Sequence, residues 1–356
     1  MKFRGVIIIR YRSLLPALLI LLSACATAQA PHGDTQTSQD EIPEDTEKAV
    51  IEYPLTLKAA YPASEDEPAG IALQEFKERV EESTGGRILV QLYPDERTDS
   101  GGELIEKEIN GDMDIAAASA EDYAVYVPKI SISALPFLFD DFESAWRFID
   151  GPVQQGVNPE LEAYDLHVLS YFDNGFKCVT SSEAAGPVRR TGDMTGLRIC
   201  TSGDQIALET MSSLGASPRS FPYTDLKAAL KSGLFDAQES SVPMIHSSRL
   251  YEEQKYLSLT NHSYDAMPLT IRKSLWDGLD PEDRMMISYA AKEAQKTDRE
   301  LVKAQTEECI SLLEQEGMTI VYPNTDGFRR QTKDVIKVFA NVYGKELAED
   351  IYDLTE

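Results

Sequence analysis

The chain has 356 residues, of which 42% are hydrophobic, and a formal net charge of −26. This apolar content is enough for a substantial core and excludes a chain that is disordered throughout. The strong negative charge argues against binding to nucleic acid or to anionic lipid surfaces, since both would repel it.

The first 24 residues have the pattern of an export signal. Basic residues at positions 2, 4, 10 and 12 precede a short apolar run, SLLPALLILLSA, at positions 13–24. This run is shorter than the roughly 20 apolar residues that a transmembrane helix needs. A basic start followed by a short apolar run is typical of a secretion signal. Removal of residues 1–24 would leave a net charge of about −30.

The segment Leu22-Ser-Ala-Cys25 resembles a bacterial lipobox, in which the cysteine is lipidated and becomes the mature N-terminus. Acyl chains on Cys25 would tether the protein without a transmembrane helix. The alternative is ordinary cleavage after Ala30, which would discard Cys25. We predict lipidation, and hence an extracytoplasmic protein anchored to a membrane of the cell envelope. Residues 25–52 are acidic and poor in large apolar groups, so they predict a flexible linker.

The remaining cysteines are Cys178, Cys200 and Cys309, and no C-x-x-C spacing occurs. We therefore expect no metal site and no cofactor. At most one disulfide can form among these three. Three unpaired thiols are favoured, with Cys178–Cys200 as the pair to test.

From residue 55 the pattern alternates between strands and helices. Two successive runs are predicted: strand 55–61, helix 69–83, strand 87–93, helix 103–110 and strand 113–118, then strands 167–172, 177–181 and 196–201 and helices 205–214 and 226–231. A turn at Asn174-Gly175 is expected between the first two strands of the second run, and Asp225 is expected to cap its last helix. Two such runs predict a mainly parallel sheet with helices on both faces, divided into two lobes with a cleft between them.

The longest predicted helix covers residues 281–316. Asp280 precedes it, Pro281 occupies its first position and Gly317 follows it. Its ends are apolar and its middle, residues 292–305, is mostly polar. This pattern predicts a strut that packs at both ends, crosses the two lobes and meets solvent in between.

Nine short motifs in consistent order carry a resemblance to a known family. They are VEESTGGR (80–87), LYP (92–94), ALPFLF (134–139), YFDNGFK (171–177), DMTGLR (193–198), LGASP (214–218), DAQE (236–239), YEEQKY (251–256) and LTNH (259–262). Together they resemble the periplasmic or lipid-anchored solute-binding proteins of tripartite ATP-independent periplasmic (TRAP) transporters. Each motif alone is weak, but the ordered set spans most of the mature chain.

The resemblance implies an α/β, two-lobe periplasmic-binding-protein-like fold with a central ligand cleft and a long lobe-spanning helix. We assign residues 53–176 and 263–305 to lobe I, and residues 177–262 and 306–356 to lobe II. The implied function is capture of a small organic solute, which is delivered to integral-membrane permease subunits by a monomeric carrier. The alternative is a ligand-sensing lipoprotein of the same fold that acts as a receptor or scaffold. An enzyme is not expected, because the histidines are scattered and no hydrolase, metalloprotease or phosphate-loop motif occurs.

The expected ligand site departs from the family pattern at three positions. The family usually has Gly-Leu-Lys-Ile-Arg, whose Arg grips a substrate carboxylate through two parallel hydrogen bonds; here the segment is GLRIC and the Arg position is Cys200. A second frequent Arg is replaced by Lys177, and a usual Asn by Ser240.

Two explanations remain open. Arg198 shares a strand face with Cys200, so it could hold a carboxylate together with Lys177. Alternatively, the pocket has lost its carboxylate anchor and takes a neutral or weakly polar solute, which we slightly prefer. Cys200 could also be a small buried residue without ligand contact.

The same resemblance points to further candidate lining residues. They are Tyr61, Ser119, Phe172, Tyr223, Gln238 and Glu239. For the three aromatic residues, packing in the core is an equal alternative. For Glu239, a structural hydrogen-bonding role at the hinge is preferred over ligand contact.

Overall fold

The computed structural model describes residues 53–96, 102–343 and 351. The predicted signal, Cys25 and the predicted linker lie outside these residues. Among the helices of the described segments, none combines the length and apolarity needed to cross a membrane.

The strands form one sheet in the order β2-β1-β3-β8-β4-β7-β5-β6, and β9 pairs with β8. Their bounds are β1 Leu55–Ala60, β2 Ile88–Tyr93, β3 Ile115–Ala117, β4 Leu166–Ser181, β5 Arg198–Thr201, β6 Ser217–Ser220, β7 Ala237–Ser241, β8 Tyr256–Arg272 and β9 Thr319–Val321. The flanks β1–β3 and β5–β7 contain the expected parallel pairs. The centre differs from the expectation, because β8 and β4 pair antiparallel with each other and with their flanking neighbours.

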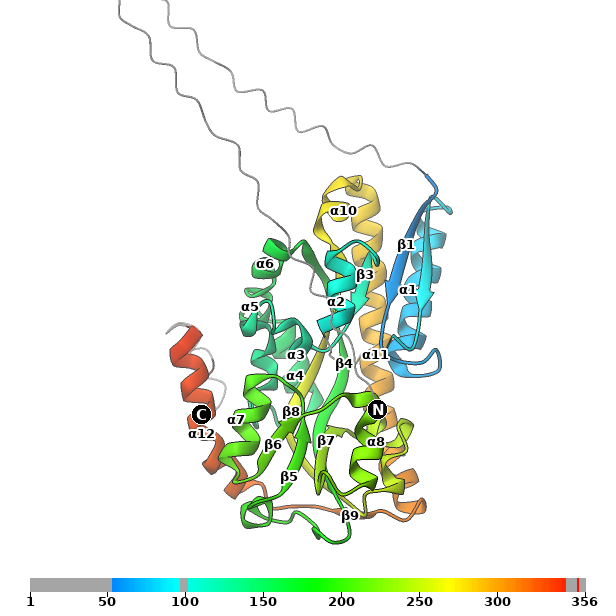
Figure 1. Ribbon diagram of the computed structural model, residues 1–356. Coiled ribbons are helices and arrows are strands. Elements are labelled where there is room, and N and C mark those ends of the chain that lie inside the picture. The colour runs from blue at the N-terminus through cyan, green and yellow to red at the C-terminus, as the bar shows by residue number, and fades with distance from the viewer. Residues whose placement is uncertain (1–52, 97–101, 344–350, 352–356) are drawn as a thin grey trace, which may run out of the picture. The chain divides into compact units, whose positions relative to one another are not determined.

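Helices cover both flanks of this sheet (Figure 1). The α-helices are α1 Pro68–Ser83, α2 Gly102–Ile109, α3 Ala120–Tyr123, α4 Phe142–Ile149, α5 Pro152–Gln155, α6 Asn158–Leu161, α7 Gln205–Ser213, α8 Tyr223–Lys231, α9 Val242–Ser247, α10 Lys273–Gly278, α11 Pro281–Gln315 and α12 Asp326–Tyr343. Short 3₁₀ segments are η1 Pro128–Ala134, η2 Glu162–Tyr164, η3 Thr191–Met194 and η4 Leu250–Glu252.

Each flank has a hydrophobic cluster of its own, which marks the two lobes, and a third cluster joins side chains of β3, β4 and β8 with Ile206 of α7 and Phe339 of α12. In the N-terminal lobe, side chains of β1–β3 and α1 pack with the first turns of α11 around Leu57, Phe76 and Ile287. In the C-terminal lobe, α8 and α9 pack with the end of α11 around Leu230 and Leu313. Figure 1 shows β1, β3 and α1 at one end of α11 and β5–β7 with α8 at the other. Among the described elements, β4, β8 and α11 extend from one lobe into the other (Figure 1).

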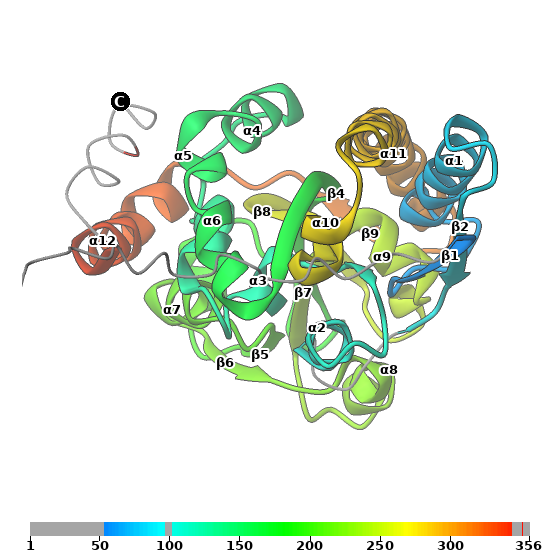
Figure 2. The same ribbon diagram turned by 90° about the horizontal axis from the view of Figure 1, so that it is seen from above.

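Helix α11 is the predicted lobe-spanning strut, and Gly317 follows it with a φ of 96°, as a helix terminator should. Helix α1 lies beside it in both views (Figures 1 and 2). The expectation of a solvated middle holds for one face only, because Lys292, Lys296 and Glu300 are exposed there whereas Asp298 and Arg299 are buried. Asp298 accepts a hydrogen bond of 2.6 Å from the Asp173 backbone on β4. Polar residues of the helix therefore pack on β4 by satisfying its backbone.

The predicted pair of strands around Asn174-Gly175 is a single strand, β4. Its pairing with β8 shifts register between Asp173 and Gly175, and Gly175 has a φ of 85°. The Asp173 side chain accepts the Gly175 N–H at 2.5 Å. Glycine therefore forms a bulge here and not a hairpin turn. The partner β8 was not assigned from the sequence.

The expected cap of α8 is also displaced. The N-cap is Pro222, and Asp225 lies within the first turn of the helix. An acidic residue in the first turn still interacts favourably with the helix dipole, which explains why the sequence signal was present but shifted.

Candidate functional site

A cavity of about 780 Å³ lies where the two lobes meet. Its walls include side chains of β4, β5, β7 and β8 and residues at the starts of α3, α7 and α8. Six of the predicted site residues line it: Ser119, Lys177, Cys200, Tyr223, Glu239 and Ser240. Both lobes therefore contribute to one cavity of the size that small-molecule sites have.

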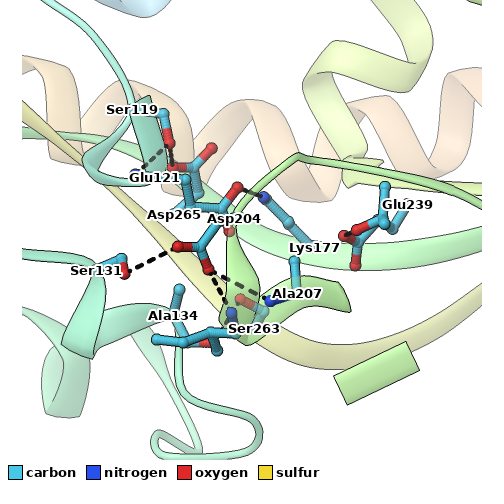
Figure 3. A network of polar contacts seen from close by, with 12 residues as sticks. Ser119, Glu121, Ser131, Ala134, Lys177, Asp204, Ala207, Glu239, Ser263 and Asp265 are labelled. Atoms are coloured by element: carbon cyan, nitrogen blue, oxygen red, sulfur yellow. Dashed lines mark hydrogen bonds and ion pairs between the residues drawn. The ribbon is translucent and has the colours of Figure 1, made fainter. Parts of the chain in front are cut away.

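Lys177 lies on the central strand β4, and its ammonium group lies 2.5 Å from Glu121 Oε2 (Figure 3). Both side chains are buried. Burial alone disfavours the charged lysine, but the negative charges of Glu121, Asp265 and Glu239 outweigh it and raise the Lys177 pKa. Lys177 is therefore a fixed positive charge at every physiological pH.

Ser119 follows β3 and caps α3 by accepting the N–H of Glu121 at 3.3 Å. Its hydroxyl also donates to Asp265 on β8 at 2.5 Å, and the Asn174 amide donates to the other oxygen of Asp265 at 3.2 Å. Burial raises the pKa of Asp265 to about 6, although Lys177 opposes the shift. Ser119 thus connects the start of α3 to the central strand β8.

Asp204 caps α7 in the C-terminal lobe by accepting the N–H groups of Ile206 and Ala207 at 2.8 and 3.3 Å. It also accepts a 3.2 Å hydrogen bond from Ser131 of η1. Burial and the charge of Glu121 raise the Asp204 pKa to about 6. Burial and the charges of Asp265 and Glu121 raise the pKa of Asp122 to about 7.

Three residues of the C-terminal lobe form the opposite wall. Cys200 on β5 is buried, and burial raises its thiol pKa to about 12. The Tyr223 hydroxyl lies 2.6 Å from Ser248 Oγ. Ser240 on β7 donates to the Gln238 side chain at 2.8 Å. These three side chains offer weakly polar atoms and no positive charge.

Glu239 joins three strands beneath the cavity. It accepts a hydrogen bond from Thr201 on β5, and its Oε2 lies 2.5 Å from His262 Nε2 on β8. Burial opposes ionisation, but the contact with His262 outweighs it and lowers the Glu239 pKa. These contacts hold the Glu239 side chain of β7 between β5 and β8.

The other four predicted site residues do not line the cavity. Arg198 is exposed and forms a bidentate pair with Asp236, with contacts of 2.9 and 2.6 Å. Tyr61 and Phe172 are buried in the N-terminal core, and Gln238 is buried with its amide donating to Thr180 at 2.8 Å. Arg198 points outward because a neighbouring carboxylate holds it, which strand alternation alone did not reveal.

The acidic lining residues were missed by sequence analysis. Glu121, Asp122, Asp204 and Asp265 lie in the cavity wall, and Lys177 is the sole cationic side chain among its described lining residues. One available signal was the position of Glu121 and Asp122 three and four residues after the end of the third predicted strand. Another was Asp204 directly before a predicted helix. Asp265 carried no such signal.

Comparison with known proteins identifies the family. Residues 59–342 match the model of the bacterial extracellular solute-binding proteins, family 7 (DctP). The chain belongs to this family. The 2,3-diketo-L-gulonate-binding periplasmic protein YiaO of Escherichia coli K12 is 30% identical over 281 residues, which are 79% of this chain and 84% of that protein.

Solved structures agree with this assignment. A TRAP periplasmic solute-binding protein from Polaromonas sp. JS666, bound to D-erythronate, has 30% identity and a TM-score of 0.78, and the match covers 83% of this chain and 98% of that one. The galactonate complex of the sugar acid binding protein DctPAm from Advenella mimigardefordensis has 27% identity and a TM-score of 0.79, covering 85% and 97%. This family member is therefore an extracytoplasmic solute-binding subunit of a TRAP-type transporter, with the two-lobe fold.

The ion pair at the cavity generates a stability prediction. Lys177→Met leaves Glu121 buried without its partner, which we expect to lower the free energy of unfolding by about 3–5 kcal/mol. Adding Glu121→Gln to this variant should restore at least half of the loss. Chemical denaturation of the wild type, both single variants and the double variant measures the coupling. Additive losses would show that the two groups do not interact.

The raised carboxyl pKa values generate a second prediction. Asp122, Asp204 and Asp265 bind protons more tightly when folded, at pKa values of about 7, 6 and 6, than when unfolded. Stability of the ligand-free protein should therefore increase as the pH falls from about 7.5 to about 5. Below that range it should decrease, because carboxyls with lowered pKa, such as Glu239, become protonated.

Denaturant midpoints measured across this pH range test the prediction. A triple variant with Asp122→Asn, Asp204→Asn and Asp265→Asn should show a flatter profile between pH 5 and 7.5. An unchanged slope in that variant would contradict the assignment.

Proposed function

We propose that the protein captures a small polar organic solute in the cavity between its lobes and acts by binding alone, without chemistry. Ser119, Lys177, Cys200, Tyr223, Glu239 and Ser240 are the predicted residues that we assign to this site. The observation that carries the proposal is the position of the cavity, whose walls come from both lobes. A solute there contacts both lobes at once.

Lobe closure is the expected consequence of binding. β4, β8 and α11 extend from one lobe into the other, so small changes in these elements can alter the opening. A solute that contacts both walls favours the closed form by its differential affinity for that form. The permease subunits of the transporter would then distinguish the closed carrier from the open one.

The class of solute is proposed to differ from that of the neighbours described above. Their ligands, D-erythronate and galactonate, are sugar acids. Here Cys200 stands at the usual anchoring position, and Arg198 is engaged by Asp236. Lys177 is engaged by Glu121. These contacts support the explanation in which the carboxylate anchor has been lost.

Capture can be tested without knowing the solute. We expect native mass spectrometry of freshly purified protein to detect a bound small molecule. After unfolding and refolding to remove it, adding the solute back at 100 times its dissociation constant should stabilise the fold by about 2.7 kcal/mol. Small-angle scattering should show a smaller radius of gyration. If no molecule co-purifies and no member of a broad metabolite panel changes the melt or the scattering profile, the proposal is wrong.

We further propose that Cys25 carries the lipid and that the carrier is a monomer. Cys25→Ala in the full chain, expressed in a bacterial host, should move the protein from the membrane fraction to the soluble extracytoplasmic fraction. Cys309→Ala removes a different cysteine and should leave the protein with the membrane. Equal fractionation of the wild type and Cys25→Ala would favour cleavage after Ala30.

A further inference from the structure

The cavity contains more negative than positive charge. Its described lining includes the carboxylates of Glu121, Asp122, Asp204 and Asp265, whereas the ammonium of Lys177 is the only cationic group among the same lining residues. Lys177 already pairs with Glu121. Asp122, Asp204 and Asp265 share the positive charge of the same lysine and have no second cation among these lining residues.

Glu121 has an oxygen that lacks a partner. Glu121 is 7% exposed. Its Oε2 accepts a hydrogen bond from Lys177, but its Oε1 makes no hydrogen bond to any described residue. An unsatisfied buried carboxylate oxygen costs about 1–3 kcal/mol or more. A hydrogen-bond donor brought by a bound molecule would remove this cost.

The neighbouring carboxylates do not share this feature. Asp265 accepts from Ser119 and Asn174, one donor on each oxygen. Asp204 accepts from Ser131 on one oxygen and from the first turn of α7 on the other. Their protein donors hold these carboxylates in place around Glu121, as Figure 3 shows.

We propose that the solute carries a protonated nitrogen, whose N–H donates to Glu121 Oε1 while Asp122, Asp204 and Asp265 supply the surrounding negative potential. This inference rests on the proposed capture of a solute in the same cavity. A neutral hydroxyl could satisfy the orphan oxygen, but it would leave the excess negative charge uncompensated. A carboxylate without a nitrogen would add to it.

The same charges explain how such a solute would close the lobes. Glu121 belongs to the N-terminal lobe and Asp204 to the C-terminal lobe, so their charges repel across the cleft. A cation between them replaces repulsion with two attractions. The ligand-free closed form is thereby disfavoured and the loaded one favoured, which gives a carrier that closes on its solute.

The first experiment compares probes of one chain length and different charge. Putrescine, 4-aminobutyrate, 1,4-butanediol and succinate each have four carbons and differ in their terminal groups. A wider set adds compounds with a protonated nitrogen, namely the standard amino acids and polyamines. It also adds compounds without one, namely D-erythronate, galactonate and dicarboxylates. Calorimetry and thermal melts are measured on protein refolded to remove bound molecules. We expect binding only among compounds with a protonated nitrogen.

The outcomes separate the two proposals. Binding confined to sugar acids, dicarboxylates or neutral alcohols would overturn the nitrogen proposal and leave capture intact. A complete lack of binding by both sets, with nothing found by mass spectrometry, would overturn both. A co-purified molecule without a basic nitrogen would also overturn the nitrogen proposal.

The second experiment tests the assigned contact. Glu121→Gln should weaken binding of the best amine probe about 10- to 100-fold, as expected for loss of a hydrogen bond to a charged group. Glu300→Gln makes the same change on an exposed position of α11 outside the cavity lining and should leave affinity unaltered. Asp265→Asn provides a second variant if Glu121→Gln folds poorly. Unchanged affinity in folded Glu121→Gln and Asp265→Asn proteins would overturn the assignment.

Discussion

The buried ion pair between Lys177 and Glu121 is the constraint on which the site depends. It joins a central strand to the helix that follows β3, and it neutralises one charge in a wall that is otherwise acidic. Such a pair is costly to desolvate and is tolerated only when its groups find good partners. Here Glu121 keeps one oxygen unsatisfied. The polar arrangement of the cavity is therefore incomplete in the protein alone.

The fold places the Lys177–Glu121 pair and the unsatisfied Glu121 oxygen at the cleft, where they can influence the opening between the lobes. β4 and β8 pair along most of their length and continue from one lobe into the other, with α11 packed on β4. Each lobe has a hydrophobic cluster of its own, which helps it to keep its shape while the connecting elements change. Carboxylates from both lobes line the cavity between them. A molecule bound in this cavity would therefore act directly on closure of the lobes.

Local signals explain what could be predicted from the sequence. The limits of α11 follow from Pro281 and Gly317, and the family motifs indicated the two-lobe fold. The bulge at Gly175 was missed because an Asn-Gly pair favours a hairpin turn, and only pairing with β8 shows otherwise. Arg198 faces solvent because Asp236, distant in sequence, holds it. The acidic wall combines Glu121, Asp204 and Asp265 from three separate segments, so no single stretch of sequence revealed it.

The three described cysteines illustrate a different property of the fold. Cys178, Cys200 and Cys309 are unpaired and buried, and burial raises their thiol pKa values to about 12, 12 and 11. Oxidation and thiol exchange proceed through the thiolate, which is almost absent at such values. Once folded, these cysteines are protected from the oxidising conditions outside the cytoplasm. In the folded protein these three thiols are therefore poor partners for disulfide exchange.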